Sequence, residues 1–236
     1  MKTLQTLCIS LVFSFYTSGI LAQNIDELVA KHIEAIGGRD NWNKLSTLRT
    51  ESVMKAQGAD IKFTVYQIDN KAMRQDINVM GMTGFSILNN QEGWVYMPWQ
   101  GHTKSEAMTA DDVKNAQDDL SLKDEFLTYK EKGKKLDYYG MDDIDGIECH
   151  KLKMTGSDGK EITFYINPEN YYVIKKTEKV QSNGQEIESS SFYSDHRKTN
   201  EGLVFPMSIS SGWGESEITR LDINPLLEAS LFKPSK

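Results

Sequence analysis

The sequence predicts an α+β protein that is mainly antiparallel β: a curled, open half-barrel of about eleven or twelve strands with a helical lid. Apolar residues alternate with period two over most of the chain after Ser46, as they do in half-buried strands. Short turns rich in Gly, Asn and Asp join these segments. Sheets of more than about ten strands tend to curl, and two amphipathic helices need an apolar surface to cover. We therefore expect the helices to close part of the hollow of the sheet.

Length and charge limit the classes of protein. The chain has 236 residues, 39% hydrophobic and 26% charged, which is too apolar for a disordered chain and fits a single domain. Its 27 Lys and Arg residues against 34 Asp and Glu residues give a net charge of −7. No basic cluster is long enough to neutralise a run of phosphates, so nucleic acid is not an expected partner.

Residues 1–22 read as a secretory signal peptide. Lys2 is the only charge before Asp26, and the apolar run Leu7–Tyr16 is about half of what a membrane span needs. We place cleavage after Ala22, with Gly19 as a second choice. The mature chain, 23–236, is then a single half-barrel domain exported to the periplasm.

The first predicted helix covers 24–36, with Asn24 as N-cap and Glu27 three residues later. Gly37 and Gly38 end it. His32 lies on or near its apolar stripe, where we expect a boundary side chain without a specific partner rather than a metal ligand. A further short turn, 40–45, should bury Trp42 and Leu45. The stripe predicted to pack on the sheet as the lid consists of Leu28, Val29, Ile33 and Ile36.

The early strands supply the candidate ligand-binding residues. Alternation places apolar residues two apart in each strand, so a strand that buries one member should bury the others on that face. We expect one shared apolar face that looks into a core or a ligand cavity. Its candidates are Phe63, Val65, Ile77, Val79, Phe85 and Trp94, with Tyr96 and Trp99 beside them.

A second helix should begin at Thr109, with Asp112 at the capping-box position and a thin stripe of Val113, Ala116 and Leu120. The strand pattern then resumes almost to the end of the chain. Pro206 suggests an edge strand or a bulge. Three hairpins are predicted at Asp145-Gly146, Asp158-Gly159 and Asn183-Gly184.

Motifs of catalysis do not occur. The sequence has no nucleophile elbow, no His-Glu-x-x-His helix, no phosphate loop and no paired cysteines of zinc spacing. We therefore expect no enzyme, no cofactor and no metal. The stretch 142–146 is better explained as a hairpin turn than as a calcium loop. Cys149 alternates with Ile147 in a strand, so a buried, inert thiol is favoured over a nucleophile.

Several stretches resemble one family. The segment 89–101, NNQEGWVYMPWQG, resembles the turn, Trp-containing strand and corner of LolA-like lipoprotein carriers, through Gly93, Trp94, Tyr96, Pro98 and Trp99. The opening 33–48 is similar to the helix, double Gly and first strand of outer membrane lipoprotein-sorting proteins. Segments 192–195, 202–206 and 230–232 resemble later landmarks of that group.

The resemblance implies a curled sheet around an apolar cavity and a periplasmic shuttle for acylated lipoproteins or other lipids, with delivery partners at the inner and outer membranes. The best-known carriers have a basic residue followed by Pro after the second strand, where an Arg helps to latch the lid. This chain has Ile68-Asp69-Asn70 at that place, and Arg74, a few residues later, is the candidate latch. A non-enzymatic carrier, expected to be a monomer, is the leading hypothesis. The alternative is an envelope protein-interaction or sensor module that uses the same sheet.

Overall fold

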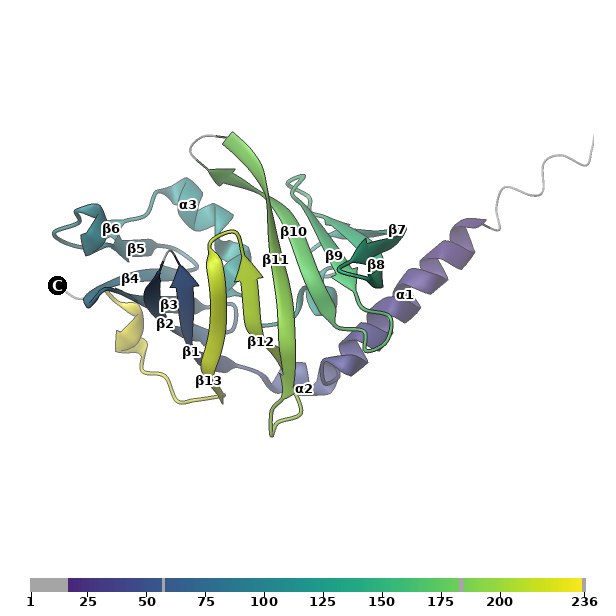
Figure 1. The fold of residues 1–236 in the computed structure, drawn as a ribbon. Helices are drawn as coiled ribbons and strands as arrows, with labels where there is room; N and C mark the ends of the chain where they lie inside the picture. The colour runs from purple at the N-terminus through teal and green to yellow at the C-terminus, as the bar shows by residue number, and fades with distance from the viewer. Residues whose placement is uncertain (1–16, 57, 183–184, 235–236) are drawn as a thin grey trace, which may run out of the picture.

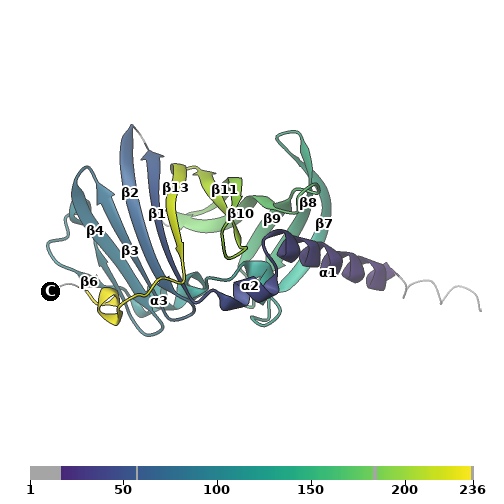
Figure 2. The ribbon, with the colours of Figure 1, turned by 90° about the horizontal axis from the view of Figure 1, so that it is seen from below.

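A single curled antiparallel sheet organises the computed structural model, which describes residues 17–56, 58–182 and 185–234 (Figure 1). Its thirteen strands lie in the order β6-β5-β4-β3-β2-β1-β13-β12-β11-β10-β9-β8-β7. Seen from below, the sheet is an open half-barrel with the helices along one end of its hollow (Figure 2). The predicted fold class is confirmed.

The strands are β1 (Thr47–Ala56), β2 (Ala59–Ile68), β3 (Ala72–Val79), β4 (Met82–Asn89), β5 (Gly93–Tyr96), β6 (Glu106–Ala107), β7 (Lys135–Ile144), β8 (Ile147–Thr155), β9 (Glu161–Ile166), β10 (Val173–Ser182), β11 (Gln185–Lys198), β12 (Val204–Ser211) and β13 (Gly214–Ile223). The helices are α1 (Thr17–Ala35), α2 (Arg39–Lys44), α3 (Ala110–Asn115) and α4 (Glu125–Thr128), with 3-10 turns η1 (Pro98–Gln100), η2 (Gln117–Leu120) and η3 (Ala229–Phe232).

The chain builds the sheet from its middle outwards. Strands β1 to β6 run in order to one edge, and a crossing segment that contains α3, η2 and α4 leads to the opposite edge. Strands β7 to β13 then return to the middle, where β13 pairs with β1. The two-residue strand β6 brings the count to thirteen, one more than the upper expectation.

Pairing register defines an inner and an outer face, because directly opposed residues of paired strands point to the same side. The inner face carries the side chains that pack against the helices. In the second half of the sheet these include Leu152, Met154 and Phe164, which share one hydrophobic cluster with α1 and α4. In the first half, the same face continues through Leu48 of β1, which packs against that cluster.

The predicted lid stripe of α1 is buried. Its four members are between 5% and 8% exposed and join the main cluster beside Phe126 of α4. Each such burial stabilises the fold by about 1.5–3 kcal/mol. The predicted turn at 40–45 is also confirmed: α2 buries Trp42, and Leu45 is 2% exposed.

The helix boundaries differ from the prediction in two places. Helix α1 begins at Thr17, so Asn24 lies inside it and not at its N-cap. The helix therefore extends into the predicted leader, whose residues 1–16 lie outside the described part of the chain. Helix α4 was not predicted; Asp124 caps it by accepting a hydrogen bond from the backbone N–H of Phe126 at 2.9 Å.

The second predicted helix is present but divided. Thr109 caps α3 by accepting a hydrogen bond from the Asp112 backbone N–H at 3.1 Å, as expected. The helix ends at Asn115 and resumes as the 3-10 turn η2. Its stripe packs as predicted, with Val113 and Leu120 buried against Leu88 of β4.

The hairpin predictions agree with the backbone where it is described. Asp145 and Gly146 adopt φ values of 52° and 86°, as a tight hairpin turn between β7 and β8 requires. Asn183-Gly184 lies outside the described residues. Pro206 lies in the interior strand β12 opposite His196 of β11, contrary to an edge position. The β12–β13 pairing begins only at Ser208, so Pro206 has no paired residue on the β13 side.

Candidate functional site

An apolar patch lines the inner face of the central strands. In the register of β2 with β3, Phe63 opposes Ile77 and Ile61 opposes Val79. Val65 continues the same face of β2. Phe63, Val65 and Val79 are only partly buried, and none of the four hydrophobic clusters of the described residues includes them. We call Ile61, Phe63, Val65, Ile77 and Val79 the inner apolar patch.

The other strand candidates do not join this patch. Phe85 opposes Asp76 on β3, whereas Ile77 opposes Gly84, so Phe85 points to the outer face. Trp94 and Tyr96 also point to the outer face, because Tyr96 opposes Phe85 and Trp94 lies two residues before it on β5. The expected single face was therefore wrong. Alternation fixes which residues of one strand lie together, but the turn between strands decides which set of the next strand joins them.

The outer-face aromatic residues form a small core of their own. Phe85 and Ile87 pack against Phe232 of η3, with Trp94 and Tyr96 beside them. The C-terminal segment therefore covers the outer face of β3 and β4.

Trp99 lies with the inner apolar patch. It belongs to η1, and a Cβ atom built on Gly84 would clash with its indole ring. Gly84 opposes Ile77 on the inner face. Trp99 therefore lies over Gly84 next to Ile77.

Arg74 lies on the outer face, away from the helices. Its Nε donates to Asp76 Oδ1 at 2.7 Å and its Nη1 donates to the Leu231 carbonyl at 3.0 Å. Its guanidinium also lies 5.0 Å from the centre of the Phe85 ring. In this structure Arg74 therefore binds the C-terminal segment and, among the described residues, forms no hydrogen bond or ion pair with α1, the predicted lid helix.

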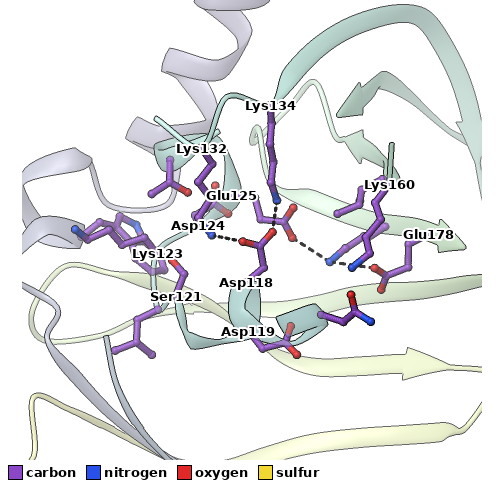
Figure 3. A pocket seen from close by; sticks show the side chains of 16 residues that line it. Asp118, Asp119, Ser121, Lys123, Asp124, Glu125, Lys132, Lys134, Lys160 and Glu178 are labelled. Atoms are coloured by element: carbon purple, nitrogen blue, oxygen red, sulfur yellow. Dashed lines mark hydrogen bonds and ion pairs between the residues drawn. The ribbon is translucent and has the colours of Figure 1, made fainter. Parts of the chain in front are cut away.

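A cavity of about 420 Å³ lies between the crossing segment and strands β9 and β10 (Figure 3). We call it the ionic cavity. Ten of its sixteen lining residues are charged, and the remainder include Trp42, Leu122 and Ile162. The charged residues are Asp118, Asp119, Asp124, Glu125 and Glu178 with Lys123, Lys132, Lys134, Lys160 and Lys176.

Two ion networks shape this cavity. Asp118 accepts hydrogen bonds from Lys132 at 2.9 Å and from Lys134 at 2.7 Å. Partial burial raises the pKa of Asp118, but the two Lys residues outweigh it and lower that pKa to about 2. Burial lowers the pKa of Lys176, but the charges of Glu125 and Glu178 outweigh this and raise it. The low pKa of Asp118 favours its carboxylate form and the raised pKa of Lys176 favours its ammonium form.

His32 has specific partners, contrary to expectation. It is 2% exposed, and its Nδ1 lies 2.7 Å from the carbonyl oxygen of Tyr171. Its Nε2 lies 3.4 Å from Asp124 Oδ1. His32 also lines a second cavity of about 210 Å³, next to the ionic cavity, together with His196 and Tyr193.

Sequence reasoning missed the ionic cavity because its residues come from distant segments. The one available signal was the density of acidic and basic residues over 111–134, which is high for a helix with so thin an apolar stripe. Lys176 and Glu178 alternate on β10, which places both on the inner face.

Three further features of the described residues concern metal binding, membrane spans and the free thiol. Within the described ranges, no group of three or more His, Cys, Asp and Glu side chains is arranged to hold a metal ion. None of the helices described in the structure is long and apolar enough to cross a membrane. Cys149 is fully buried beside Ile144 and Tyr165, as predicted, but Ile147, which alternates with it in β8 and was expected to be buried too, is 37% exposed.

An open half-barrel of this kind, with helices in its hollow and an apolar patch on its inner face, is a LolA-like fold. The chain is similar in structure to a DUF1329 family protein from Desulfovibrio piger (TM-score 0.57, 13% identity, 89% of this chain and 97% of that chain). It is also similar to a LolA superfamily protein from Nitrosomonas europaea (TM-score 0.56, 13% identity, 88% and 96% covered). A third similar structure is that of a domain named as an outer membrane lipoprotein-sorting protein domain, from Vibrio parahaemolyticus (TM-score 0.53, 12% identity, 87% of this chain and 94% of that chain). No protein-family model and no curated protein matches the sequence.

Proposed function

We propose that the protein is a non-enzymatic carrier that binds acyl chains on the inner apolar patch. The observation that carries the proposal is that Phe63, Val65 and Val79 lie on the inner face, partly exposed and outside the hydrophobic clusters of the described residues. Apolar side chains left out of core packing mark binding sites for apolar ligands. Each CH₂ group that leaves water contributes about 0.8 kcal/mol, so a single acyl chain gains several kcal/mol there.

The cellular setting belongs to the same proposal. The leader predicted at 1–22 directs the chain to the periplasm, where acylated molecules must cross water between two membranes. A carrier there collects its cargo from a partner at the inner membrane and delivers it to a partner at the outer membrane. The neighbours from Nitrosomonas and Vibrio are named for the LolA superfamily and for lipoprotein sorting, which supports this setting by analogy of fold.

Val65→Phe tests the proposal. Added bulk in a close-packed core costs about 1–3 kcal/mol, whereas added bulk at the wall of an open binding surface costs little stability. We expect Val65→Phe to keep the melting temperature of the unmodified protein and to lose most of its binding of a fluorescent fatty acid.

Thr64→Phe is the matched control. Thr64 precedes Val65 on β2 and opposes Asp76 on the outer face, so the same bulk is added on the opposite side of one strand. Fatty-acid binding should be unchanged in this variant. If the unmodified protein binds no fatty acid and Val65→Phe unfolds it, the patch is a core, and the protein-interaction or sensor module becomes the better account.

A further inference from the structure

The charges of the ionic cavity divide into two groups with opposite excess (Figure 3). Around Asp118, two cations, Lys132 and Lys134, surround one anion at 2.9 and 2.7 Å. Around Lys176, two anions surround one cation, with Glu125 at 3.0 Å and Glu178 at 3.9 Å. Lys160 also lies beside Glu178, and Asp119 adds a third anion near Lys176 (Figure 3). The cavity therefore has an electropositive end, at Lys132 and Lys134, and an end with three anions against two cations.

Hydrogen-bond acceptors of the cavity are left unused. Glu125 Oε2 is buried without a hydrogen-bond partner, although Oε1 of the same carboxylate is paired with Lys176. Ser121 Oγ is buried without a partner as well. The Asp119 carboxylate takes part in none of the ion pairs found among the described residues, and burial raises its pKa. A ligand that satisfies these acceptors must bring N–H or O–H donors, and a primary ammonium offers three.

The crossing segment that lines the cavity meets the first half of the inner face at one contact. Gln67 Nε2 donates to the backbone carbonyl of Asp119 at 2.8 Å. Gln67 lies on the same face of β2 as Val65, two residues away, which is about 7 Å along a strand. The ionic cavity and the inner apolar patch therefore lie at neighbouring parts of the inner face, as the headgroup and the acyl chains of one amphiphilic molecule require.

We propose that the ionic cavity binds the headgroup of a zwitterionic phospholipid with a primary ammonium, of the phosphoethanolamine type. The phosphate lies at Lys132 and Lys134, and the ammonium lies at Glu125 and Asp119. The acyl chains lie on the inner apolar patch, so this inference rests on the carrier function proposed above. A lipoprotein anchor carries acyl chains but no phosphate beside an ammonium, and the cavity therefore favours phospholipid as the cargo.

The test compares four probes with identical fluorescent acyl chains: phosphatidylethanolamine, phosphatidylcholine, phosphatidylglycerol and the uncharged diacylglycerol. Phosphatidylethanolamine should bind about tenfold more tightly than each of the other three. Phosphatidylcholine keeps the positive charge but has no N–H donor, so it isolates the contribution of the unused acceptors. Phosphatidylglycerol lacks the positive charge.

Asp119→Asn should reduce this preference about tenfold and leave diacylglycerol binding unchanged. Asp111→Asn is the matched control, because Asp111 is exposed on the same crossing segment and does not line the cavity. Lys132→Gln should weaken both phosphatidylethanolamine and phosphatidylglycerol by about tenfold relative to diacylglycerol. Melting temperatures of the variants verify that the fold is kept.

The outcomes separate this inference from the carrier function. Equal binding of all four probes would overturn the headgroup site and leave the carrier in place. Failure of every probe to bind would overturn both. Tight binding of soluble O-phosphoethanolamine, equal to that of the lipid, would show that the ligand is a free zwitterion and would overturn the lipid assignment.

Discussion

His32 of α1 lies 3.4 Å from Asp124, the residue that caps α4. A buried imidazole thus links α1 to the N-terminal cap of α4. Burial lowers the pKa of His32, but the negative charge of Asp124 and the hydrogen bond to the Tyr171 carbonyl outweigh it, and the pKa is raised above its usual value. Folding therefore favours the protonated form of His32.

The sign of the resulting pH dependence follows from linkage. Between about pH 6.5 and the raised pKa of His32, the folded chain holds a proton that the unfolded chain has lost. The free energy of unfolding should then fall with rising pH, by at most about 1.4 kcal/mol per pH unit. Urea unfolding at a series of pH values between 6 and 9 measures this slope.

The matched variants for this prediction are His32→Gln and Asp124→Asn. Each removes one partner, so each should flatten the slope above pH 6.5, whatever its effect on absolute stability. An unchanged slope in both would show that His32 does not titrate in this range. His150 and His196, whose pKa values burial lowers, act below pH 6.5 and in the opposite direction.

Arg74 should secure the C-terminal segment. Arg74→Gln removes the charged donor to the Leu231 carbonyl and the pairing with Asp76, and we expect a loss of about 1–3 kcal/mol. Hydrogen exchange at Leu231 and Phe232 should become faster at the same time. The control is Arg197→Gln, because Arg197 is 63% exposed and pairs with Asp195 on the surface, so its loss should be below about 0.5 kcal/mol. Equal losses in the two variants would contradict the role of Arg74.

Cys149 should be unreactive in the folded protein. It is fully buried, and burial together with the charges of Asp143 and Asp142 raises the pKa of its thiol, which lowers the fraction of reactive thiolate. In a Cys8→Ser background, a thiol reagent should label the protein only after unfolding. Labelling within minutes under native conditions would show that the cluster around Cys149 opens readily.

Gly37 should tolerate no side chain. Its φ is +115°, and a Cβ atom there would clash with the carbonyl oxygen of Gly202. Gly38 also has a positive φ, +80°, but a Cβ atom there would meet only Glu34, at 3.6 Å. Both Ala variants are strained in the backbone, so Gly37→Ala should cost about 1–3 kcal/mol more than Gly38→Ala in urea unfolding. Equal losses of stability in the two variants would mean that the turn at Gly202 moves away from the added methyl group at little cost in free energy.

Elements governed by neighbours in the sequence could be predicted from it. The α1 stripe, the Thr109 cap and the Asp145-Gly146 turn depend on residues within a few positions of one another, and all three have the expected form. Alternation within β2 and β3 also placed Phe63 with Val65 and Ile77 with Val79.

Features set by distant segments could not be predicted. The turn at Met80 and Gly81 sets the register of β3 with β4, and only that register separates Phe85 from Ile77. The partners of His32, Tyr171 and Asp124, come from two other parts of the chain, so they cannot be predicted from the sequence of the helix alone. The ionic cavity could not be predicted for the same reason, because its charged residues come together only when the crossing segment packs against β10.

The pairing of β13 with β1 also sets the order in which the sheet can be completed. Arg49 and Asp222, which are joined across these two strands, lie 173 positions apart. Closing so long a loop is entropically slow, so formation of this central pair should limit the folding rate. Until β13 arrives, one edge of β1 has open backbone hydrogen-bonding groups in the middle of the future sheet, and such an edge recruits strands from other chains. The partly synthesised protein is therefore more prone to aggregation than the finished one, and a chaperone that shields β1 would protect it during that interval.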